Sequence, residues 1–260
     1  MTPELTISLG DELYAALGWC QAVEPLSSRY PDITLDDAYR IQQQLTARRL
    51  ANGERIVGKK IGVTSQAVMD MLGVGKPDFG MLTDAMRFTN GSTIDVRTLI
   101  QPKAEGEIAF LLKQDLKGPG VNEADVLAAT EGVMACFEIV DSRIRDWKIR
   151  IQDTVADNAS CGVFVLGDRI VDPRCVDLLA CRMVLKKNGE TVVTGQGNAT
   201  MGSPLAAMAW LANTLGALGV TLQAGEVVLS GALGAMVPVR SGDRLDMHIE
   251  DLGECSVQFA

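Results

Sequence analysis

Acidic and apolar residues alternate in EGEIAFLLK, which spans residues 105–113. A period of two is typical of a β-strand with one open and one buried face. Glu105 and Glu107 lie on one face of such a strand, about 6.6 Å apart. The other face carries Ile108, Phe110 and Leu112. The pattern predicts a strand that backs onto an apolar core and presents two carboxylates in front of it.

Runs of the same β type precede and follow this strand, separated by Gly, Pro and Asp. They are IVGKKIGVT (56–64), ACFEIVDS (135–142), GVFVLG (162–167), EVVLSG (226–231), RLDMHIE (244–250) and ECSVQF (254–259). Asn188 and Gly189 divide two further β-type runs, and an Asn-Gly pair suits the positive φ angles of a tight hairpin. Residues 54–260 are therefore predicted to form a β-rich body.

Three helices are predicted from N-cap residues that are followed by apolar residues at helical spacing. They begin after Thr34, Asn122 and Ser203 and are expected to end near Gly53, Gly132 and Gly219. Residues 1–53 are expected to be mainly helical. Because the sequence has no internal repeat or linker, we predict one α+β domain over residues 1–260.

The composition excludes several classes of protein. The 260 residues include 24 Lys and Arg against 33 Asp and Glu, a net charge of −9. Nucleic acids and anionic membranes bind basic surfaces, so neither is an expected partner. The N-terminus lacks the basic and apolar regions of a secretory signal, which fits a cytoplasmic protein. Residues 191–225 carry no charge, but polar residues and glycines interrupt them, so we expect a buried helix there and not a membrane span.

Cysteine and histidine usage excludes two kinds of site. Six cysteines occur at no CxxC spacing, and the chain has one histidine, His248. Zinc fingers and redox dithiols therefore lack their ligands. We expect the cysteines to be buried, reduced thiols.

A third acid, Glu138, lies within the largely apolar run ACFEIVDS. An unpaired carboxylate in such a strand is costly, so it needs a partner or a metal ion. Glu105 and Glu107 alone fit a solvated strand end better than a metal site, but Glu138 favours a shared cation. Carboxylate oxygens prefer hard divalent ions, so the three glutamates predict Mg²⁺ or Mn²⁺ over Zn²⁺.

A lysine and an aspartate stand close to glycines in two further segments. Strand alternation places Lys60 between Gly58 and Gly62 on one face, which predicts room for a ligand. Such a lysine can hold a substrate carboxylate or transfer a proton. The alternative is an edge lysine that protects the sheet, and Lys59 fits that description. Asp78 lies in KPDFG, as in a turn, where aspartate most often accepts a backbone N–H.

Two loops carry further polar groups. Residues 141–162, DSRIRDWKIRIQDTVADNASCG, are too polar to be all core. They fit a site wall or lid, a subunit contact or solvated surface. Residues 230–236, SGALGAM, follow an apolar strand, and their backbone N–H groups suit a carboxylate or phosphate. The chain contains no nucleotide-binding fingerprint.

Six segments together resemble the 2-hydroxypenta-2,4-dienoate hydratases (2-oxopent-4-enoate hydratases) of catechol meta-cleavage pathways. They are KKIGVTS (59–65), GVGKPDFGMLTDAM (73–86), QPKAEGEIAF (101–110), FEIVDSRIRDWK (137–148), DTVADNASCG (153–162) and AGEVVLSGALGAMVPVRSGD (224–243). These hydratases and the related 4-oxalocrotonate decarboxylases belong to the fumarylacetoacetate hydrolase superfamily. The resemblance therefore implies a mixed β-roll core, an acid-bound divalent metal and 2-oxo acid substrates.

The resemblance also assigns residues, position by position. It implies Glu105, Glu107 and Glu138 as metal ligands, in agreement with the triad above. Lys60 matches the active-site lysine, and Asp78 matches a residue expected to transfer protons. Four implied substrate-binding positions are Ser160, Ser230, Gly231 and Leu233.

The implied reaction is hydration of 2-hydroxypenta-2,4-dienoate to 4-hydroxy-2-oxopentanoate in the degradation of aromatic compounds. The metal would stabilise the dienolate, and Lys60 and Asp78 would move protons and orient water, with their acid and base roles unassigned. The nearest competing function is that of 4-oxalocrotonate decarboxylase, for which we expect an apolar residue and a tyrosine at the positions of Asp78 and Phe79.

Two further functions fit the sequence less well. A C–C hydrolase of acylpyruvates needs a His–Glu pair, and the sole histidine, His248, lies in the β-rich tail. A catalytically silent scaffold would be expected to lose a metal ligand or Lys60, and this chain retains them all. The resemblance further implies a homo-oligomer and an association with 4-oxalocrotonate decarboxylase.

Overall fold

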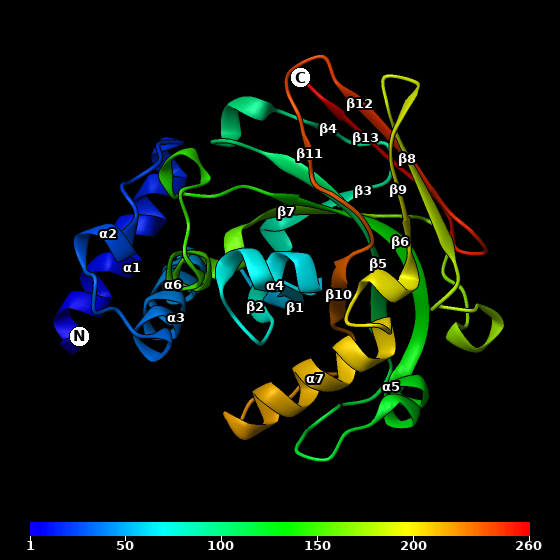
Figure 1. The fold of residues 1–260 in the computed structure, drawn as a ribbon, viewed down its shortest axis with the longest axis horizontal. Helices are drawn as coiled ribbons and strands as arrows, with labels where there is room; N and C mark the ends of the chain where they lie inside the picture. Colours follow the sequence, from blue (N-terminus) through cyan, green and yellow to red (C-terminus); the bar gives the residue numbers. More distant parts are fainter.

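The computed structural model describes residues 1–260 and combines α-helices with two mixed β-sheets (Figure 1). The α-helices are α1 (Pro3–Trp19), α2 (Leu26–Arg29), α3 (Leu35–Ala51), α4 (Gln66–Leu72), α5 (Glu123–Ala129), α6 (Ile151–Ala156) and α7 (Pro204–Ala217). The strands are β1 (Ile56–Gly62), β2 (Asp78–Thr83), β3 (Arg87–Thr89), β4 (Thr93–Ile94), β5 (Lys103–Leu112), β6 (Thr130–Val140), β7 (Cys161–Leu166), β8 (Arg182–Lys187), β9 (Glu190–Gln196), β10 (Val227–Ala232), β11 (Val237–Pro238), β12 (Arg244–Ile249) and β13 (Gly253–Phe259). Short 3₁₀ helices are η1 (Asp84–Met86), η2 (Val96–Thr98), η3 (Arg145–Trp147), η4 (Asn158–Ser160), η5 (Pro173–Cys175) and η6 (Gly197–Ala199).

Both sheets mix parallel and antiparallel pairs. The larger sheet has the order β2-β1-β10-β5-β6-β7-β3, with β11 also paired to β5. Its β1–β10 and β3–β7 pairs are parallel, and the others are antiparallel. The smaller sheet has the order β4-β13-β12-β8-β9. The predicted mixed β core with a helical N-terminal section is confirmed.

One core of 40 buried residues joins the two sheets and helix α7. It includes Phe110 from β5, Met247 from β12 and Leu211 from α7. The glycine between the two glutamates of β5 is part of this packing. A Cβ atom on Gly106 would lie 2.3 Å from Sδ of Met183 and 2.5 Å from Sδ of Met247. Because residue 106 has no side chain, the smaller sheet packs closely behind β5 while the glutamates face the other way.

The N-terminal helices have a separate core of 11 buried residues, which α6 from the middle of the chain shares. Figure 1 shows this group (blue, with α6 in green) beside the sheets. Helix α3 begins with a capping box, in which the hydroxyl of Thr34 accepts from the N–H of Asp37 and the Asp37 carboxylate accepts from the N–H of Thr34. The helical N-terminal section predicted for residues 1–53 is confirmed.

The predicted hairpin and the predicted end of one helix are confirmed. The predicted end of a second helix is wrong. Asn188 and Gly189 have φ angles of 54° and 88° between β8 and β9, as an Asn-Gly turn requires. Helix α7 ends at Ala217, close to the predicted end. The helix after Asn122 ends at Ala129, and the expectation that it continues to Gly132 is wrong. The next strand begins at once, because Thr130 is opposite Leu112 of β5.

Two expectations about individual side chains are also wrong. β1 pairs with β2 on one side and β10 on the other, so neither of its lysines lies at a sheet edge. Lys59 is buried and forms an ion pair with Glu226. All six cysteines are free, but Cys175 is exposed and Cys20 is partly exposed. No helix has the length and apolar character needed to cross a membrane.

Candidate active site

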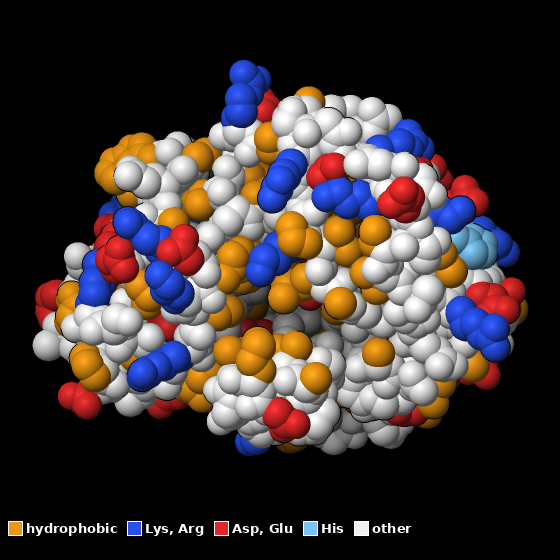
Figure 2. Space-filling view, turned by 45° about the horizontal axis from the view of Figure 1, so that its top comes forward, with side chains coloured by type: hydrophobic (Ala, Val, Ile, Leu, Met, Phe, Trp, Pro, Cys, Tyr) orange, Lys and Arg blue, Asp and Glu red, His pale blue; other side chains and the backbone are white.

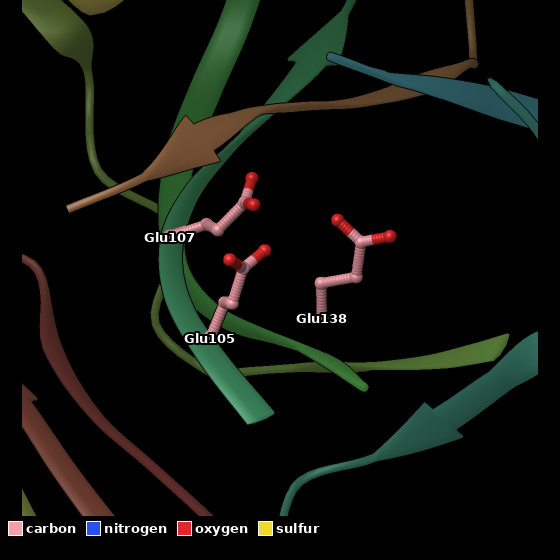
Figure 3. Close-up of side chains that lie close together, drawn as sticks. All are labelled: Glu105, Glu107 and Glu138. Atoms are coloured by element: carbon pink, nitrogen blue, oxygen red, sulfur yellow. The ribbon is translucent and has the colours of Figure 1, made fainter. Parts of the chain in front are cut away.

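The three glutamates meet where β5 and β6 pair. Glu105 and Glu138 are directly opposite each other in the antiparallel register, and Glu107 follows two residues along β5 on the same face. One oxygen from each carboxylate lies within 4.8 Å of the others. Figure 3 shows the three carboxylates directed toward a common space. The alternation of β5 and the acid embedded in β6 thus form one cluster.

This cluster has unsatisfied oxygens. Glu107 and Glu138 have no exposed surface, and Oε1 of Glu107 and both oxygens of Glu138 lack a hydrogen-bond partner. Glu105 is partly exposed to a cavity, and desolvation within the protein, together with Glu138, raises the pKa of Glu105 to about 7. Burial and the same neighbour raise the pKa of Glu107 well above its usual range. Buried carboxylates without partners, and with only oxygen to offer, fit a hard divalent cation.

Lys60 provides the one positive charge in contact with the cluster. Its ammonium nitrogen lies 3.1 Å from Oε1 of Glu138, without the alignment of a hydrogen bond, and both side chains are buried. Burial disfavours the lysine charge, but Glu138 and Asp78 outweigh this effect and raise the pKa of Lys60. The lysine is therefore an ammonium ion in this site. β10 and β5 separate β1 from β6 in the sheet, so its strong curvature is what brings these two side chains together.

Asp78 lies beside Lys60. It is opposite Gly62 in the β1–β2 register, and both of its buried carboxylate oxygens lack a hydrogen-bond partner. Burial raises the pKa of Asp78 to about 6, although Lys60 opposes the shift. The expectation that Asp78 lies in a turn is wrong, because it begins strand β2. The backbone N–H groups of Gly62 and Asp78 lie close enough to lower its pKa slightly, but neither has the geometry of a full hydrogen bond, so the carboxylate remains available to a ligand.

The space where side chains on Gly58 and Gly62 would lie is filled by protein. A Cβ atom on Gly62 would lie 2.3 Å from Oδ1 of Asp78, so the glycine accommodates the Asp78 carboxylate. A Cβ atom on Gly58 would lie 1.8 Å from the carbonyl oxygen of Val227 on the neighbouring strand. Both glycines are explained by close packing, and the space predicted for a ligand lies next to them, because Lys60 and Gly62 line a cavity.

That space is a cavity of about 460 Å³. Its polar lining comes from Lys60, Thr64, Ser65, Asp78, Glu105, Thr154 and Ser160. Most of the remaining wall is apolar and includes Val68, Met71, Trp147, Ile149 and Met236. Figure 2 shows a hollow in one face of the molecule with hydrophobic side chains (orange) around it. A small molecule with one polar end and one apolar end matches this lining.

The polar segment 141–162 contributes part of the cavity wall. Trp147 lines the cavity, and its indole nitrogen donates to the carbonyl of Gln101 at 3.0 Å. The ammonium of Lys103 lies 4.2 Å from the centre of the Trp147 ring. Ser160 faces the cavity, and its hydroxyl is 3.2 Å from that of Thr154. Of the three interpretations given for this segment, the structure supports a site wall.

The predicted substrate-binding residues of the SGALGAM loop contact other parts of the protein. The N–H of Gly231 donates at 2.7 Å to Oε2 of Glu107, so the carboxylate that it binds belongs to the protein. The buried hydroxyl of Ser230 donates to the carbonyl of Ile108, and Leu233 packs in the core. These three predicted substrate-binding residues do not line the cavity. Their neighbours Ala232, Gly234, Ala235 and Met236 do.

Sequence reasoning did not single out Thr154, and it attached no role to Arg143 or Asp157. Arg143 and Asp157 form a buried ion pair next to Ser160. Only the burial of this polar segment indicates that these residues are important for the site. The local sequence pattern does not predict that burial. His248 is exposed on β12 and does not line the cavity. Figure 2 shows the single histidine (pale blue) on the outer surface.

Comparisons with known proteins agree with this fold. The model of the fumarylacetoacetate (FAA) hydrolase C-terminal family matches residues 58–260. The chain is 57% identical over 252 residues to 2-hydroxyhexa-2,4-dienoate hydratase of Comamonas testosteroni, covering 96% of each chain. It is 61% identical over 221 residues to 2-hydroxypent-2,4-dienoate hydratase of Pseudomonas putida, covering 85% of this chain and 100% of the relative. It is 47% identical over 259 residues to 2-keto-4-pentenoate hydratase of Paraburkholderia xenovorans, covering 100% and 96%.

Solved structures provide a second comparison. 4-Oxalocrotonate decarboxylase from Pseudomonas putida G7, complexed with magnesium and adipate, superposes with a TM-score of 0.97 at 36% identity. The match covers 100% of this chain and 99% of that one. Fumarylpyruvate hydrolase from Pseudomonas aeruginosa, in complex with Mn²⁺ and pyruvate, has a TM-score of 0.62 at 15% identity, covering 78% and 88%, and shares the fold alone.

Proposed function

The chain belongs to the fumarylacetoacetate hydrolase family, and on this premise we propose that it is a hydro-lyase that depends on a divalent metal. The proposed reaction adds water to 2-hydroxypenta-2,4-dienoate (2-oxopent-4-enoate) and gives 4-hydroxy-2-oxopentanoate. Hydratases that are 47–61% identical over most of the chain support this class of reaction. The observation that carries the proposal is the unpartnered Asp78 carboxyl group beside Lys60 in the cavity.

We propose that Glu105, Glu107 and Glu138 hold the metal ion, Mg²⁺ or Mn²⁺. Some carboxylate oxygens of Glu107 and Glu138 have no hydrogen-bond partner. They support this assignment, because a bound cation would supply the missing interaction. When bound there, the cation supplies Lewis-acid stabilisation of the negative charge that develops on the oxygens of a 2-oxo acid. Glu105 lines the cavity, so a substrate in the cavity would reach the same site.

Lys60 and Asp78 are the groups available for proton transfer. Ketonisation of the dienoate moves a proton from the 2-hydroxyl group to C5 and leaves a double bond between C3 and C4. Water then adds its oxygen to C4 while C3 gains a proton, so the reaction needs a group that takes a proton from water and a group that returns one. A buried carboxyl group with a pKa of about 6 can hold or release a proton near neutral pH, which suits Asp78 to this work. The ammonium of Lys60 can stabilise negative charge beside it.

Ser160 is proposed to contact the substrate or water, because its hydroxyl group faces the cavity. Gly231 is proposed to act through Glu107, to which its N–H donates. Ser230 and Leu233 support the same loop from the core and are not proposed to touch the substrate.

The second candidate function is decarboxylation of 4-oxalocrotonate. The close superposition on a decarboxylase, with a TM-score of 0.97, favours it. A decarboxylase would use the same metal to stabilise an enolate, but it has no water to activate. Asp78 therefore favours the hydratase, since a buried polar group without a partner is costly unless the reaction uses it.

The two candidates are separated by turnover of two substrates. The protein is treated with EDTA, reloaded with Mg²⁺ or Mn²⁺, and given fresh 2-hydroxypenta-2,4-dienoate or 4-oxalocrotonate under ultraviolet detection. Consumption of the dienoate that stops after EDTA treatment and returns when the metal is restored supports the hydratase. Release of CO₂ from 4-oxalocrotonate, with no change in the dienoate, supports the decarboxylase. Absence of turnover with both substrates contradicts both proposals.

We also propose that the protein is a cytoplasmic homo-oligomer that associates with 4-oxalocrotonate decarboxylase. Exposed apolar side chains such as Trp19 (76% exposed) and Leu218 (62% exposed) support an assembly, because such residues are often covered in oligomers. Light scattering of the protein alone, and then mixed with the decarboxylase, measures both associations. A monomer that stays unchanged in the mixture contradicts them.

A further inference from the structure

The turn that carries Ser160 has an unusual backbone. Asn158, Ala159 and Ser160 have consecutive φ angles of 53°, 51° and 53°. Residues other than glycine avoid this left-handed region, because the Cβ atom approaches the carbonyl oxygen. Three in a row persist only where surrounding groups hold them.

Arg143 holds both sides of this turn. Its Nη2 donates to the carbonyl of Asp157, which precedes the turn, and Nη1 donates at 2.7 Å to the carbonyl of Cys161, which follows it. Nε also donates to the Asp157 carboxylate. Asn158 links the turn to β2, because its amide accepts from the N–H of Met81 at 2.7 Å and donates to the Met81 carbonyl at 2.9 Å. The position of Ser160 is therefore fixed from several directions.

The hydrogen-bond direction of Ser160 follows from its partners. Oδ2 of Asp157 lies 3.4 Å from the Ser160 hydroxyl, and an ionised carboxylate only accepts. Burial raises the pKa of Asp157 to about 6 and the ion pair with Arg143 opposes this shift, so Asp157 is mainly ionised at pH 7 and above. The single hydroxyl proton of Ser160 is thus directed to Asp157, and the Thr154 hydroxyl, 3.2 Å away, donates to Ser160. One lone pair of Ser160 remains, and Ser160 is one of the residues that line the cavity.

We propose that Asp157, anchored by Arg143, is a positioning residue that makes Ser160 a hydrogen-bond acceptor toward the ligand. The group that Ser160 accepts from is an O–H group: the water that adds to the substrate, or the hydroxyl group of the hydrated product. This inference rests on the proposed hydratase function and adds to it the orientation of the reacting O–H group.

A double-mutant cycle tests the coupling between the two residues. Asp157→Asn introduces an amide that donates to Ser160, so the Ser160 proton must turn toward Thr154 or into the cavity and the hydrogen-bond pattern at Ser160 is reversed. We expect Ser160→Ala and Asp157→Asn each to lower kcat by about tenfold or more, and the double variant to resemble Ser160→Ala. A further tenfold loss when Asp157→Asn is added to Ser160→Ala would overturn the proposal, since Asp157 would then act independently of Ser160. Full activity of Ser160→Ala would overturn it as well.

The matched control is Ser27→Ala. Ser27 is a buried serine whose hydroxyl donates to the buried carboxylate of Asp153 at 2.5 Å, and it does not line the cavity. This variant loses the same kind of hydrogen bond outside the site and should keep kcat within about twofold. A tenfold loss in the control would attribute the effects to general destabilisation and count against the proposal.

Ligand binding tests the proposal without turnover. Calorimetry compares 4-hydroxy-2-oxopentanoate with 2-oxopentanoate, which lacks only the hydroxyl group, on Mg²⁺-loaded wild type and on Ser160→Ala. We expect the wild type to prefer the hydroxylated acid by about tenfold, and Ser160→Ala to lose this preference. Absence of the preference in the wild type would overturn the inference, even if the hydratase is active or Asp157→Asn fails to fold. Preference without any hydration of the dienoate would retain the inference and reject the proposed function.

Discussion

The ammonium nitrogen of Lys60 lies 3.1 Å from Oε1 of Glu138, although two other strands separate β1 from β6 in the sheet. This contact joins the groups proposed for proton transfer to the groups proposed to hold the metal. A cation bound by Glu138 would therefore lie close to the lysine charge. Asp78 lies close to both Lys60 and Glu138 and completes the arrangement.

Metal binding should stabilise the fold. The three glutamates repel one another, and Glu107 and Glu138 have oxygens without a hydrogen-bond partner, so a divalent cation should bind the native state in preference to the unfolded chain. At a Mg²⁺ concentration of 100 times Kd, we expect about 2.7 kcal/mol of added stability, seen as a rise in Tm. Glu107→Gln should lose this rise, and Glu131→Gln, an exposed position on the same sheet, should keep it. An unchanged Tm of the wild type in Mg²⁺ and Mn²⁺ would reject the metal site.

Asp78→Asn should separate chemistry from metal binding. The amide keeps the shape of the carboxyl group but cannot take or return a proton, so we expect kcat to fall by about 100-fold or more. Because Asp78 is not one of the clustered glutamates, the Mg²⁺-induced rise in Tm should remain. Asp32→Asn, at an exposed position, serves as the control. Wild-type kcat in Asp78→Asn would contradict the role proposed for this residue.

Gly62→Ala should damage the site through Asp78. The added Cβ atom would lie 2.3 Å from Oδ1 of Asp78, so the carboxyl group must move. We expect kcat/KM to fall by at least about tenfold, since small displacements of reacting groups are costly. Gly75→Ala is the matched control, because a Cβ atom there would meet no atom within 4 Å. Equal activity of the two variants would show that the position of Asp78 is unimportant.

The start of helix α3 should give a pH-dependent contribution to stability. The hydrogen bond from the Thr34 hydroxyl is the main cause that lowers the pKa of Asp37 to about 2. The unfolded value is about 3.9, so this stabilisation is present above pH 4 and is lost as the pH falls through 2. Asp37→Asn should therefore cost about 1 kcal/mol in urea unfolding at pH 7 and progressively less toward pH 2. Asp36→Asn, which is exposed, should show no such trend, and a constant cost for Asp37→Asn at all pH values would contradict this assignment.

The local sequence pattern was sufficient to predict the parts of the site that lie on regular strands. The alternation in β5 places Glu105 and Glu107 on one face, and the polar residue inside an apolar run marks Glu138. The pairing of Glu105 with Glu138 depends on register between distant segments, which strand periodicity does not contain. The resemblance to a known family identified these residues together, and the structure provides the contact.

Further features depend on contacts that no local pattern contains. The glycines beside Lys60 indicate close packing, but only the sheet order reveals that Asp78 and the Val227 carbonyl are what pack there. The SGALGAM loop has the N–H group expected of an anion site, yet that group binds Glu107 of the same chain. Thr154, Asp157 and Arg143 acquire their roles from the burial of a segment that resembles solvated surface in sequence.

The most direct test of the proposed hydration follows oxygen from water into the product. The metal-loaded protein converts 2-hydroxypenta-2,4-dienoate in ¹⁸O-labelled water, and the isotope shift of the C4 resonance is read by ¹³C NMR, since the 2-oxo group exchanges oxygen without enzyme. We predict a labelled hydroxyl group at C4 that requires Mg²⁺ or Mn²⁺ and is absent after EDTA treatment. Unchanged dienoate, or label at C4 that is independent of metal, would contradict metal-dependent hydration.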